Sequence, residues 1–561
     1  MNKHIVLITA LIAFSNCSLT GQSAYYQQGH DIYHSYDRFD ILYTPTTTIQ
    51  TSAKYYSRNA IIDFLKGNSQ LKLGVKDKSA RSYFLRDTLL SKPTENLSLL
   101  KHVYRNPSHL FEYNSKDFSF VINPILNFNI GQDFSNDEFI FQNTRGLELY
   151  GSLDQKIYFS SAFYENQSNF LSYIKPFVEQ YKAIPGQGNY KDYQSGIVSS
   201  FKGYDYSNAI AYLGYQISKH SILELGHGKH FIGNGVRSLL LSDSGHNYLY
   251  LKFRVAVWKI YYQSIFAELT SGSGRFVPNN ILLPKKYMAS HYLGIKLNPK
   301  LEVGLFESVV FSRENQFELQ YLNPVILYRT IEHQLDSPDN VLLGLNIKWN
   351  LFNRMSLYGQ LLLDELKFDE IFAGTGWWGN KYGIQLGLKY LNLGNIDHLD
   401  IQIEYNLVRP YTYSHWNSTE EFPILSVGSY AHYNQALAHP LGANFSEILA
   451  LIKYKFNPKL YLELGYLYTK VGKDSQNNYG SDILLNNNSR VSDFGISLHQ
   501  GEKSNISQFS SRLSFEIMRQ LNFDVNLIFR RDSNKKFGTL DTKYFSAGIR
   551  YNVGFARIDY K

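Results

Sequence analysis

The chain has 561 residues, of which 44% are hydrophobic, 19% charged and 16% aromatic, and its formal net charge is +8. Abundant aromatic residues at modest net charge exclude a disordered chain, and a single cysteine excludes a disulfide scaffold. Only 15 prolines exclude a collagen-like fibre. Length alone would suggest about three or four soluble domains. The composition instead favours one large, tyrosine-rich, β-rich protein, and its mild positive charge gives no reason to expect nucleic acid as a partner.

Residues 1–21 have the pattern of a secretory signal peptide. Lys3 and His4 form a short basic region, and the apolar run 5–14 is too short to span a bilayer. We expect cleavage near Gly21; the alternative is a buried N-terminal helix.

Cys17 follows the apolar run at the distance of a lipoprotein acceptor. Asn16 precedes it, where such a site has a small side chain, and this favours cleavage without lipidation. Cleavage near Gly21 would remove the chain's single cysteine, so that disulfides are excluded even in an oxidising compartment.

Residues 22–117 differ in pattern from the rest of the chain. Apolar residues recur at helical spacing in 57–65 and 78–90, and the run 75–77 offers an N-cap for the second segment. We therefore expect a mainly helical N-terminal region that is periplasmic or fills the lumen of the structure that follows.

From about residue 118 to the C-terminus, segments alternate between apolar and polar residues with period two. In the run 399–407, apolar residues take the odd positions and polar residues the even ones. Such strands have one apolar and one polar face. The same alternation occurs in 383–390, 513–517, 523–530 and 556–560.

Short polar connectors join many of these strands. The clearest are Asn298-Pro299-Lys300 and Asn457-Pro458-Lys459, each followed by a new alternating run. Similar joints stand at 154–156, 218–220, 353–354 and 519–520, with looser ones near Arg254 and Gly394.

Longer connections alternate with these turns. They lie at 165–203, 270–289, 365–381, 409–446 and 469–508, and the first contains a helical segment, 167–183, interrupted or started by Pro176. Short turns at one end and long loops at the other are typical of an outer-membrane barrel. If both chain termini lie at the short-turn end, eight short turns imply an all-β transmembrane barrel of about 18 antiparallel strands over 118–561. A soluble multi-domain β protein is the alternative, and the final Lys561 after Tyr560 is an imperfect match to the usual aromatic barrel end.

A family resemblance rests on the run 224–243, ELGHGKHFIGNGVRSLLLSD. Supporting runs are Glu318–Val325, Ser337–Asn340 and Leu437–Phe445. Together they resemble the capsule-assembly Wzi family of outer-membrane proteins, and in particular its Bacteroidetes branch of gliding-motility RemB-like proteins. The resemblance implies a barrel of about 18 strands with an N-terminal helical bundle. It also implies attachment of polysaccharide to the cell surface, or a role in gliding.

The glycine-rich part of that run holds four candidate binding residues: Lys229, His230, Asn234 and Arg237. Two histidines three positions apart suit a metal site on a helix better than one at a strand end interrupted by glycines. The run also lacks the Lys-Ser/Thr ending of a phosphate-binding P-loop. The glycines fit a tight bend or a close approach to the barrel wall. The four polar residues would then face the lumen or bind an anionic sugar.

Two aromatic clusters are the other candidates. Aromatic rings stack on the apolar faces of sugars, and Arg or Lys pairs with acidic sugars. An interfacial aromatic girdle is the alternative explanation. The residues are Trp377, Trp378, Lys381, Arg409, Tyr411, Tyr413 and Trp416.

The sequence thus predicts a non-enzymatic protein of the Gram-negative outer membrane. Ser242-Asp243 could suggest a hydrolase, but the chain has no G-x-S-x-G elbow. No metal or cofactor is expected. The expected partners are outer-membrane lipid, surface polysaccharide, and gliding or capsule-export proteins. A porin-like transport channel is the alternative function, because a barrel of about 18 strands is wide enough for a pore unless it is filled.

Overall fold

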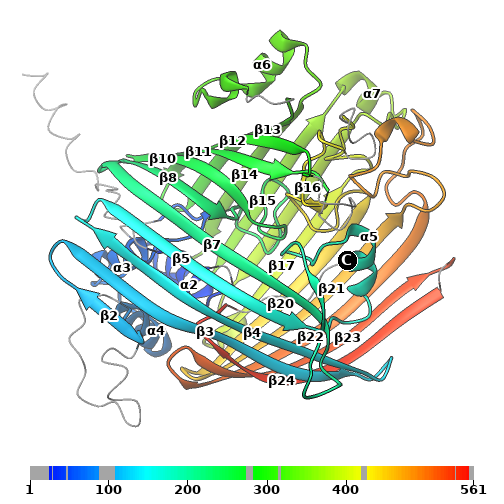
Figure 1. The fold of residues 1–561 in the computed structure, drawn as a ribbon. Helices are drawn as coiled ribbons and strands as arrows, with labels where there is room; N and C mark the ends of the chain where they lie inside the picture. The colour runs from blue at the N-terminus through cyan, green and yellow to red at the C-terminus, as the bar shows by residue number, and fades with distance from the viewer. Residues whose placement is uncertain are drawn as a thin grey trace, which may run out of the picture.

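The computed structural model describes residues 24–27, 29–45, 49–87, 108–272, 282–313, 318–417, 426–536 and 538–554. The signal peptide, Cys17 and the run 556–560 lie outside the described residues. The described chain forms a closed barrel of 18 antiparallel strands (Figure 1), which confirms the predicted fold class. The strands are β3 (Phe118–Asp133), β4 (Glu138–Leu153), β5 (Ile157–Ser168), β7 (Lys202–Ser218), β8 (Ser221–Gly228), β10 (Tyr248–Val257), β11 (Ile260–Thr270), β12 (Lys285–Asn298), β13 (Leu301–Phe311), β14 (Asn340–Leu351), β15 (Met355–Glu365), β16 (Lys381–Tyr390), β17 (Leu399–Val408), β20 (Phe445–Asn457), β21 (Leu460–Lys473), β22 (Glu502–Met518), β23 (Leu521–Asn534) and β24 (Gly538–Tyr551).

Each strand pairs with its neighbour in the chain, and β24 closes the barrel on β3. Two short strands, β2 (Phe111–Asn114) and β6 (Lys191–Gln194), extend the wall beside β3 and β7. On β17, Asp400, Glu404 and Asn406 are buried inside the barrel. Ile403 and Tyr405 are exposed on its outer surface. The alternation therefore separates a polar inner face from an apolar outer face, as the sequence predicted.

The end of the barrel with short connectors, here called the turn end, carries the predicted joints. Most stand where the sequence placed them, including the two Asn-Pro-Lys turns before β13 and β21. The position near Arg254 was wrong, because β10 runs through it and the turn follows at Trp258-Lys259. The joint near Gly394 is a longer connector containing η2 (Leu393–Asn395).

At the opposite end, here called the loop end, two long loops fold into the lumen. The loop 229–247 and the described parts of the loop 409–444, which are 409–417 and 426–444, pack against inward-facing side chains of β10–β15 and β20–β22, forming an apolar core inside the barrel. Leu239, Leu240 and Leu241 at its centre are fully buried. The short strands β9 (Phe231–Ile232), β18 (Ala431–His432) and β19 (Gln435–Ala436) belong to these loops.

The other loops at this end carry short helices. α5 (Lys175–Tyr181) lies in the predicted segment 167–183 and has Pro176 in its first turn, where proline is tolerated. The remaining elements are η1 (Leu319–Leu322), α6 (Tyr328–Leu335), α7 (Phe368–Phe372) and η3 (Asn487–Ser489).

The N-terminal segment forms helices α2 (Ile32–Tyr43), α3 (Arg58–Gly67) and α4 (Val75–Leu85), with strand β1 (Ala53–Lys54) between the first two. α3 begins as predicted after Ser57, whose hydroxyl accepts a hydrogen bond from the Ala60 N–H at 3.1 Å. α4 differs from the prediction, because Gly74 is its N-cap and Asp77 lies within its first turn. Among the described residues, no helix is long and apolar enough to cross a membrane.

Buried ion pairs join this segment to the inner wall. Arg38 of α2 contacts Asp400 of β17 at 2.8 Å, and the Lys348 ammonium of β14 contacts Asp40 at 2.7 Å. β1 pairs with β9 of the inward loop, Ala53 opposite Ile232. The segment and the inward loop thus meet inside the barrel.

Candidate functional site

The glycine-rich loop that follows β8 turns into the lumen and approaches the opposite wall. The backbone N–H groups of Val236 and Arg237 donate to the Glu404 carboxylate at 2.7 and 3.0 Å. A Cβ on Gly235 would stand 2.4 Å from a Glu404 oxygen, so only glycine permits this approach. Gly233 has a φ of +146°. The close approach to the barrel wall that the sequence predicted is confirmed.

Arg237 is anchored on the same wall. Its guanidinium donates through Nε and Nη2 to the Glu447 carboxylate, each at 3.3 Å. His439, from the run 437–445, also contacts that carboxylate, with its Nε2 at 3.1 Å. Two of the sequence runs that carry the family resemblance therefore meet at Glu447.

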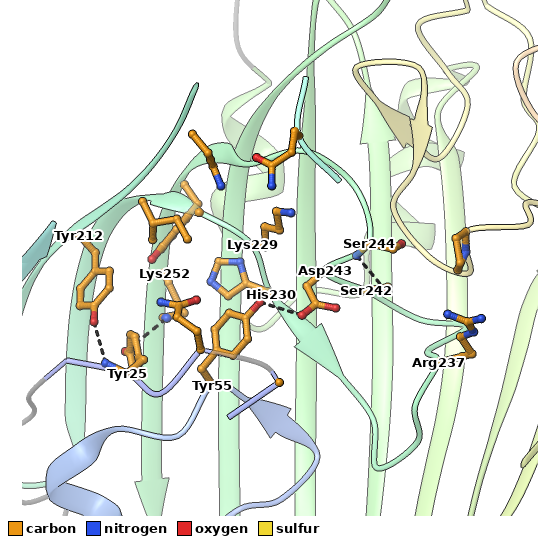
Figure 2. Close-up of a pocket in the computed structure, with 18 of the residues that line it drawn as sticks. Tyr25, Tyr55, Tyr212, Lys229, His230, Arg237, Ser242, Asp243, Ser244 and Lys252 are labelled. Carbon is orange, nitrogen blue, oxygen red and sulfur yellow. Dashed lines mark hydrogen bonds between the residues drawn. The ribbon is translucent and has the colours of Figure 1, made fainter. Parts of the chain in front are cut away.

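A cavity of about 300 Å³ lies between the inward loop, the N-terminal segment and strands β7, β8 and β10 (Figure 2). This volume is at the lower end of the range for ligand pockets, about 300–1,000 Å³. Hydroxyl, amide and charged groups line it together with aromatic rings. The lining includes Tyr25, Tyr55, Asn208, Tyr212, Lys229, His230, Arg237, Asp243 and Lys252.

Figure 2 shows Lys229, His230 and Asp243 around the middle of the cavity, and the Lys229 ammonium donates to the Gly186 carbonyl. Burial lowers the pKa of Lys229 to about 8, with Asp243 opposing the shift. Burial raises the pKa of Asp243 above its ordinary value, against Lys229 and the hydrogen bond from Tyr55. The Tyr55 hydroxyl donates to Asp243 at 2.9 Å. The site therefore holds a cation of reduced basicity beside a carboxyl group.

His230 stands at the inner wall of the cavity. Its ring lies 4.4 Å from the Tyr250 ring, edge to face, and its Nδ1 is 3.1 Å from the Tyr248 hydroxyl. Burial, reinforced by Lys252, holds the pKa of His230 well below its ordinary value. A neutral imidazole at this position offers one donor and one acceptor.

Asn234, the fourth candidate binding residue of the glycine-rich run, lies outside the cavity. The Asn234 side chain is buried and donates to the Ser52 hydroxyl at 2.8 Å, which ties the inward loop to the N-terminal segment. The structure therefore brings Lys229, His230 and Arg237 to one cavity and places Asn234 outside it.

The predicted aromatic residues lie together at the loop end, away from this cavity. Trp378 is half-buried, with the Arg490 guanidinium 4.1 Å above its ring and the Lys381 ammonium at 5.1 Å. The Tyr411 ring meets its edge at 6.2 Å. Trp377 is covered by the Lys367 ammonium at 4.5 Å. These contacts join three loops to one another.

The other predicted residues of the two aromatic clusters are mostly buried among the same loops. Tyr413 donates through its hydroxyl to the Leu239 carbonyl at 2.8 Å, inside the apolar core. Lys381 is fully buried against Glu365 at 3.0 Å, and Arg409 donates to the Ile496 carbonyl at 3.4 Å. The half-buried Trp416 contacts Asn487.

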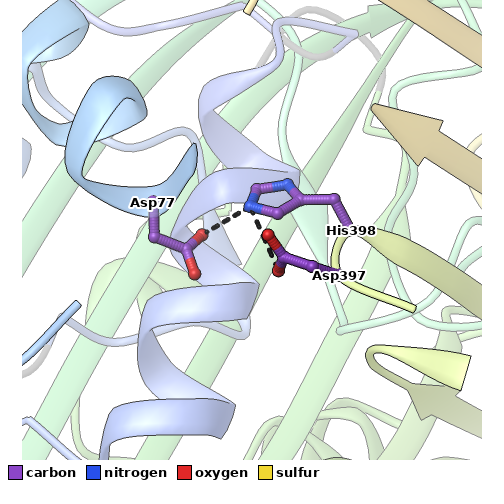
Figure 3. Close-up of side chains that lie close together, drawn as sticks. All are labelled: Asp77, Asp397 and His398. Carbon is purple, nitrogen blue, oxygen red and sulfur yellow. Dashed lines mark ion pairs between the residues drawn. The ribbon is translucent and has the colours of Figure 1, made fainter. Parts of the chain in front are cut away.

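One cluster among the described residues combines donors of the kind that bind metal ions: Asp77, Asp397 and His398 (Figure 3). His398 Nε2 is 3.1 Å from Asp77, whose carboxylate also accepts the Arg38 guanidinium at 3.1 Å. The Arg38 cation already balances Asp77, and its charge would repel a metal ion. The cluster joins α4 and α2 to the connector between β16 and β17.

No family model matches the chain, and no curated protein matches it by sequence. Among solved structures it is similar to Wzi of Escherichia coli, described as a carbohydrate-binding β-barrel involved in group 1 capsule assembly. The TM-score is 0.54 at 12% identity, and the match covers 96% of this chain and 100% of Wzi. The chain has the fold of Wzi.

Two other solved structures match a smaller part of the chain. OprD of Pseudomonas aeruginosa matches with a TM-score of 0.41 and 11% identity, over 77% of this chain and 94% of OprD. OccAB2 of Acinetobacter baumannii matches with a TM-score of 0.42 and 10% identity, over 78% of this chain and 99% of OccAB2.

Several cavity residues were missed by the sequence reasoning. Tyr25 and Tyr55 come from the N-terminal segment, and no pattern in the sequence links them to the glycine run. Tyr212 and Lys252 occupy inward positions of β7 and β10. Strand alternation could have flagged the latter two as lumen residues, but not their shared cavity.

Proposed function

We propose that the chain is a non-enzymatic barrel of the Gram-negative outer membrane that binds surface polysaccharide, in the manner of the Wzi type. Its outer wall supports this location, because apolar side chains such as Leu223, Leu225, Leu249 and Leu251 are exposed there in rows. Lipid is the environment in which such a wall is stable.

The observation that carries the binding proposal is the chemistry of the cavity. Sugars offer hydroxyl groups that hydrogen-bond to amides and tyrosines, and apolar faces that stack on aromatic rings. Lys229 adds a cation that suits an acidic sugar, since charge-assisted bonds are the stronger ones. We therefore place a sugar unit of an anionic polysaccharide in this cavity.

The same proposal assigns the parts of the chain. Residues 1–21 are the signal peptide, 22–117 the periplasmic or lumen-filling N-terminal region, and 118–561 the barrel. The loop end would face outward and the turn end the periplasm, as in outer-membrane barrels generally.

A channel function is disfavoured by the apolar core inside the barrel. Leu239, Leu240 and Leu241 are fully buried there, in contact with inward side chains of the wall. A water-filled pore has a polar interior instead. The barrel is then a closed scaffold, serving capsule attachment or, as in the RemB-like branch, gliding.

Binding is tested with the purified full-length protein and acidic oligosaccharides prepared from the cell's own surface polysaccharide. Lys229→Gln removes the cavity cation, and we expect affinity to fall roughly 10-fold or more, the value of one charge-assisted bond. Lys191→Gln, an exposed change on β6, is the matched control and leaves affinity unchanged. Equal affinity of both variants would contradict the assignment of the cavity.

The cellular role is tested by deleting the gene and measuring capsule retention, colony spreading and adhesion. Loss of capsule alone assigns the capsule role, and loss of spreading alone assigns gliding. Unchanged behaviour in all three assays would refute both.

A further inference from the structure

The outward-facing residues of β13 change from exposed to buried toward the loop end of the strand. Its odd-numbered residues face outward: Leu305 is 56% exposed, but Val309 and Phe311, closer to the loop end, are 0% and 1% exposed. Neighbouring outward residues follow the same course, since Leu343 of β14 is exposed and Val341 is buried. Something in the chain itself covers this part of the outer wall.

A row of polar residues crosses the covered area. Ser264 of β11 stands opposite His291 of β12, and His291 opposite Glu307 of β13. Glu307 in turn stands opposite Leu343, which is exposed and apolar. The polar row therefore lies level with the apolar surface of the barrel, where an uncovered carboxylate is unfavourable in lipid.

The covering segment is 318–339, which contains η1 and α6 and folds back outside the barrel. The Tyr328 hydroxyl bonds to His291, and the Arg329 backbone N–H donates to Glu307 at 3.1 Å. Tyr321, Tyr328 and Ile331 complete an apolar cluster with the outward side chains of β12, β13 and β14. In Figure 1, α6 stands beside the loop end of β13, apart from the loops that enter the lumen.

Two sequence runs that carry the family resemblance hold this segment in place. Asp339, at the end of the segment, accepts both Nη atoms of Arg313 at 2.8 Å and the Tyr321 hydroxyl at 2.7 Å. Arg313 also lies 3.6 Å from Glu318. The Arg313 guanidinium thus contacts both ends of the segment, at Glu318 and at Asp339.

The first half of the segment exposes three large apolar side chains. Leu319 is 70%, Val325 87% and Leu327 63% exposed. The second half, α6, exposes polar residues instead, among them Arg329 and His333. A segment that lies in a membrane interface places its apolar side chains in the lipid and its polar ones toward the headgroups.

We propose that segment 318–339 is a lipid-contacting belt, which covers the polar row of the wall and inserts Leu319, Val325 and Leu327 among the acyl chains of the surrounding membrane. The belt lies level with the exposed apolar surface of the wall: the Pro324 carbonyl, next to Val325, accepts a hydrogen bond from Tyr262 of β11, which stands across β12 from the exposed Leu305. This shared level assigns the same occupant, lipid, to both. The inference rests on the proposed outer-membrane location and adds a second membrane contact to that of the strands.

The test uses the full-length chain with Cys17→Ser, which then carries one introduced cysteine at a time. Val325→Cys reports on the belt, Leu343→Cys on the uncovered wall, and Val491→Cys on an exposed loop-end residue outside the belt. Each variant is labelled with a fluorophore and reconstituted into phospholipid vesicles. Quenching is measured with nitroxide-bearing acyl chains and separately with iodide in the water.

We expect the label at 325 to lose fluorescence to the lipid quencher as strongly as the label at 343, and the label at 491 to respond to iodide. Quenching of 325 by iodide alone would overturn the belt while leaving the barrel location intact. Protection of 325 from both quenchers would also overturn it, and would indicate a contact with another copy of the chain. Failure of the label at 343 to meet lipid would refute the proposed location itself.

Diluting the protein in the vesicles separates lipid from a second copy. We expect quenching at 325 by lipid to be independent of the protein-to-lipid ratio. A rise in quenching on dilution would show that copies of the chain had covered the belt, and would contradict the proposal.

Discussion

The lumen is filled from both ends by segments that the protein holds in different ways. The N-terminal segment is attached to the wall by charges, including Arg38 on Asp400 and Asp40 on Lys348. The inward loop at the other end also bonds to carboxylates of the wall, at Glu404 and Glu447, but in addition it packs in an apolar core around Leu239–Leu241.

This difference determines how each filling can be removed. A buried ion pair depends on both partners, because loss of one leaves an uncompensated buried charge. Apolar packing has no such requirement and loses stability in proportion to the volume removed. The N-terminal segment is therefore expected to respond to charge changes and acid, and the inward loop to cavity-forming substitutions.

The largest effect is expected from Lys348→Met, which leaves Asp40 buried without its cation. Breaking a buried pair in this way costs about 3–5 kcal/mol. We expect the N-terminal segment to become accessible to added protease while the barrel stays folded. The double variant Asp40→Asn with Lys348→Met should restore protection, and its failure to do so would contradict the ion-pair account.

Leu240→Ala tests the other filling. Leu240 is fully buried and packs against Gly344 of β14. A Cβ on Gly344 would stand 2.4 Å from the Leu240 side chain. We expect a loss of about 2–5 kcal/mol in the free energy of unfolding, read from the urea midpoint. Protease protection of the N-terminal segment should not change; release of that segment would show that the two fillings are not independent.

Acid should loosen the N-terminal segment. Burial raises the pKa of Asp37, but Lys389, Lys348 and Lys54 outweigh it and lower the pKa to about 2. A carboxyl whose pKa is lowered on folding stabilises the fold above its ordinary pKa, near 4, and ceases to do so as pH falls through the folded value. The contribution, about 2 kcal/mol, is therefore lost between about pH 4 and pH 2.

Protease protection of the segment, measured across that range, checks this expectation. In Asp37→Asn the contribution of this group to the acid dependence should disappear. An identical acid profile in the two proteins would assign the transition to other carboxyl groups.

The smallest effect is expected at Trp378, which neither filling uses. Arg490→Gln removes the cation above its ring, and a half-exposed cation–π contact is worth about 0.5–1 kcal/mol. We expect a small fall in thermal stability with both fillings protected. A large fall would show that the loop-end assembly supports the lumen as well.

The sequence was sufficient to predict the barrel because strands and turns are local. Period two and the two Asn-Pro-Lys connectors depend only on neighbouring residues, and so does the helix start at Ser57. The paths of the long loops depend on contacts distant in sequence. The inward course of 229–247 and the outward fold of 318–339 are fixed by Glu404 and Glu307, which lie on the opposite and the adjacent wall.

The candidate site shows the same limit. The glycine run predicted a close approach to the wall, and Gly235 against Glu404 confirms it. The run could not indicate that Tyr25 and Tyr55, nearly 200 positions earlier, complete the cavity, since the separation between Tyr55 and its partner Asp243 is 188 residues. The roles of Lys229 and of the aromatic residues stay predictions until the binding test.

A closed barrel would not conduct ions. Planar-bilayer recording of the full-length protein tests directly whether the barrel is closed. We expect no steady open conductance, because the apolar core around Leu239–Leu241 and the N-terminal segment both fill the lumen. Steady open conductance from the intact, folded chain would contradict the account and assign the protein to transport.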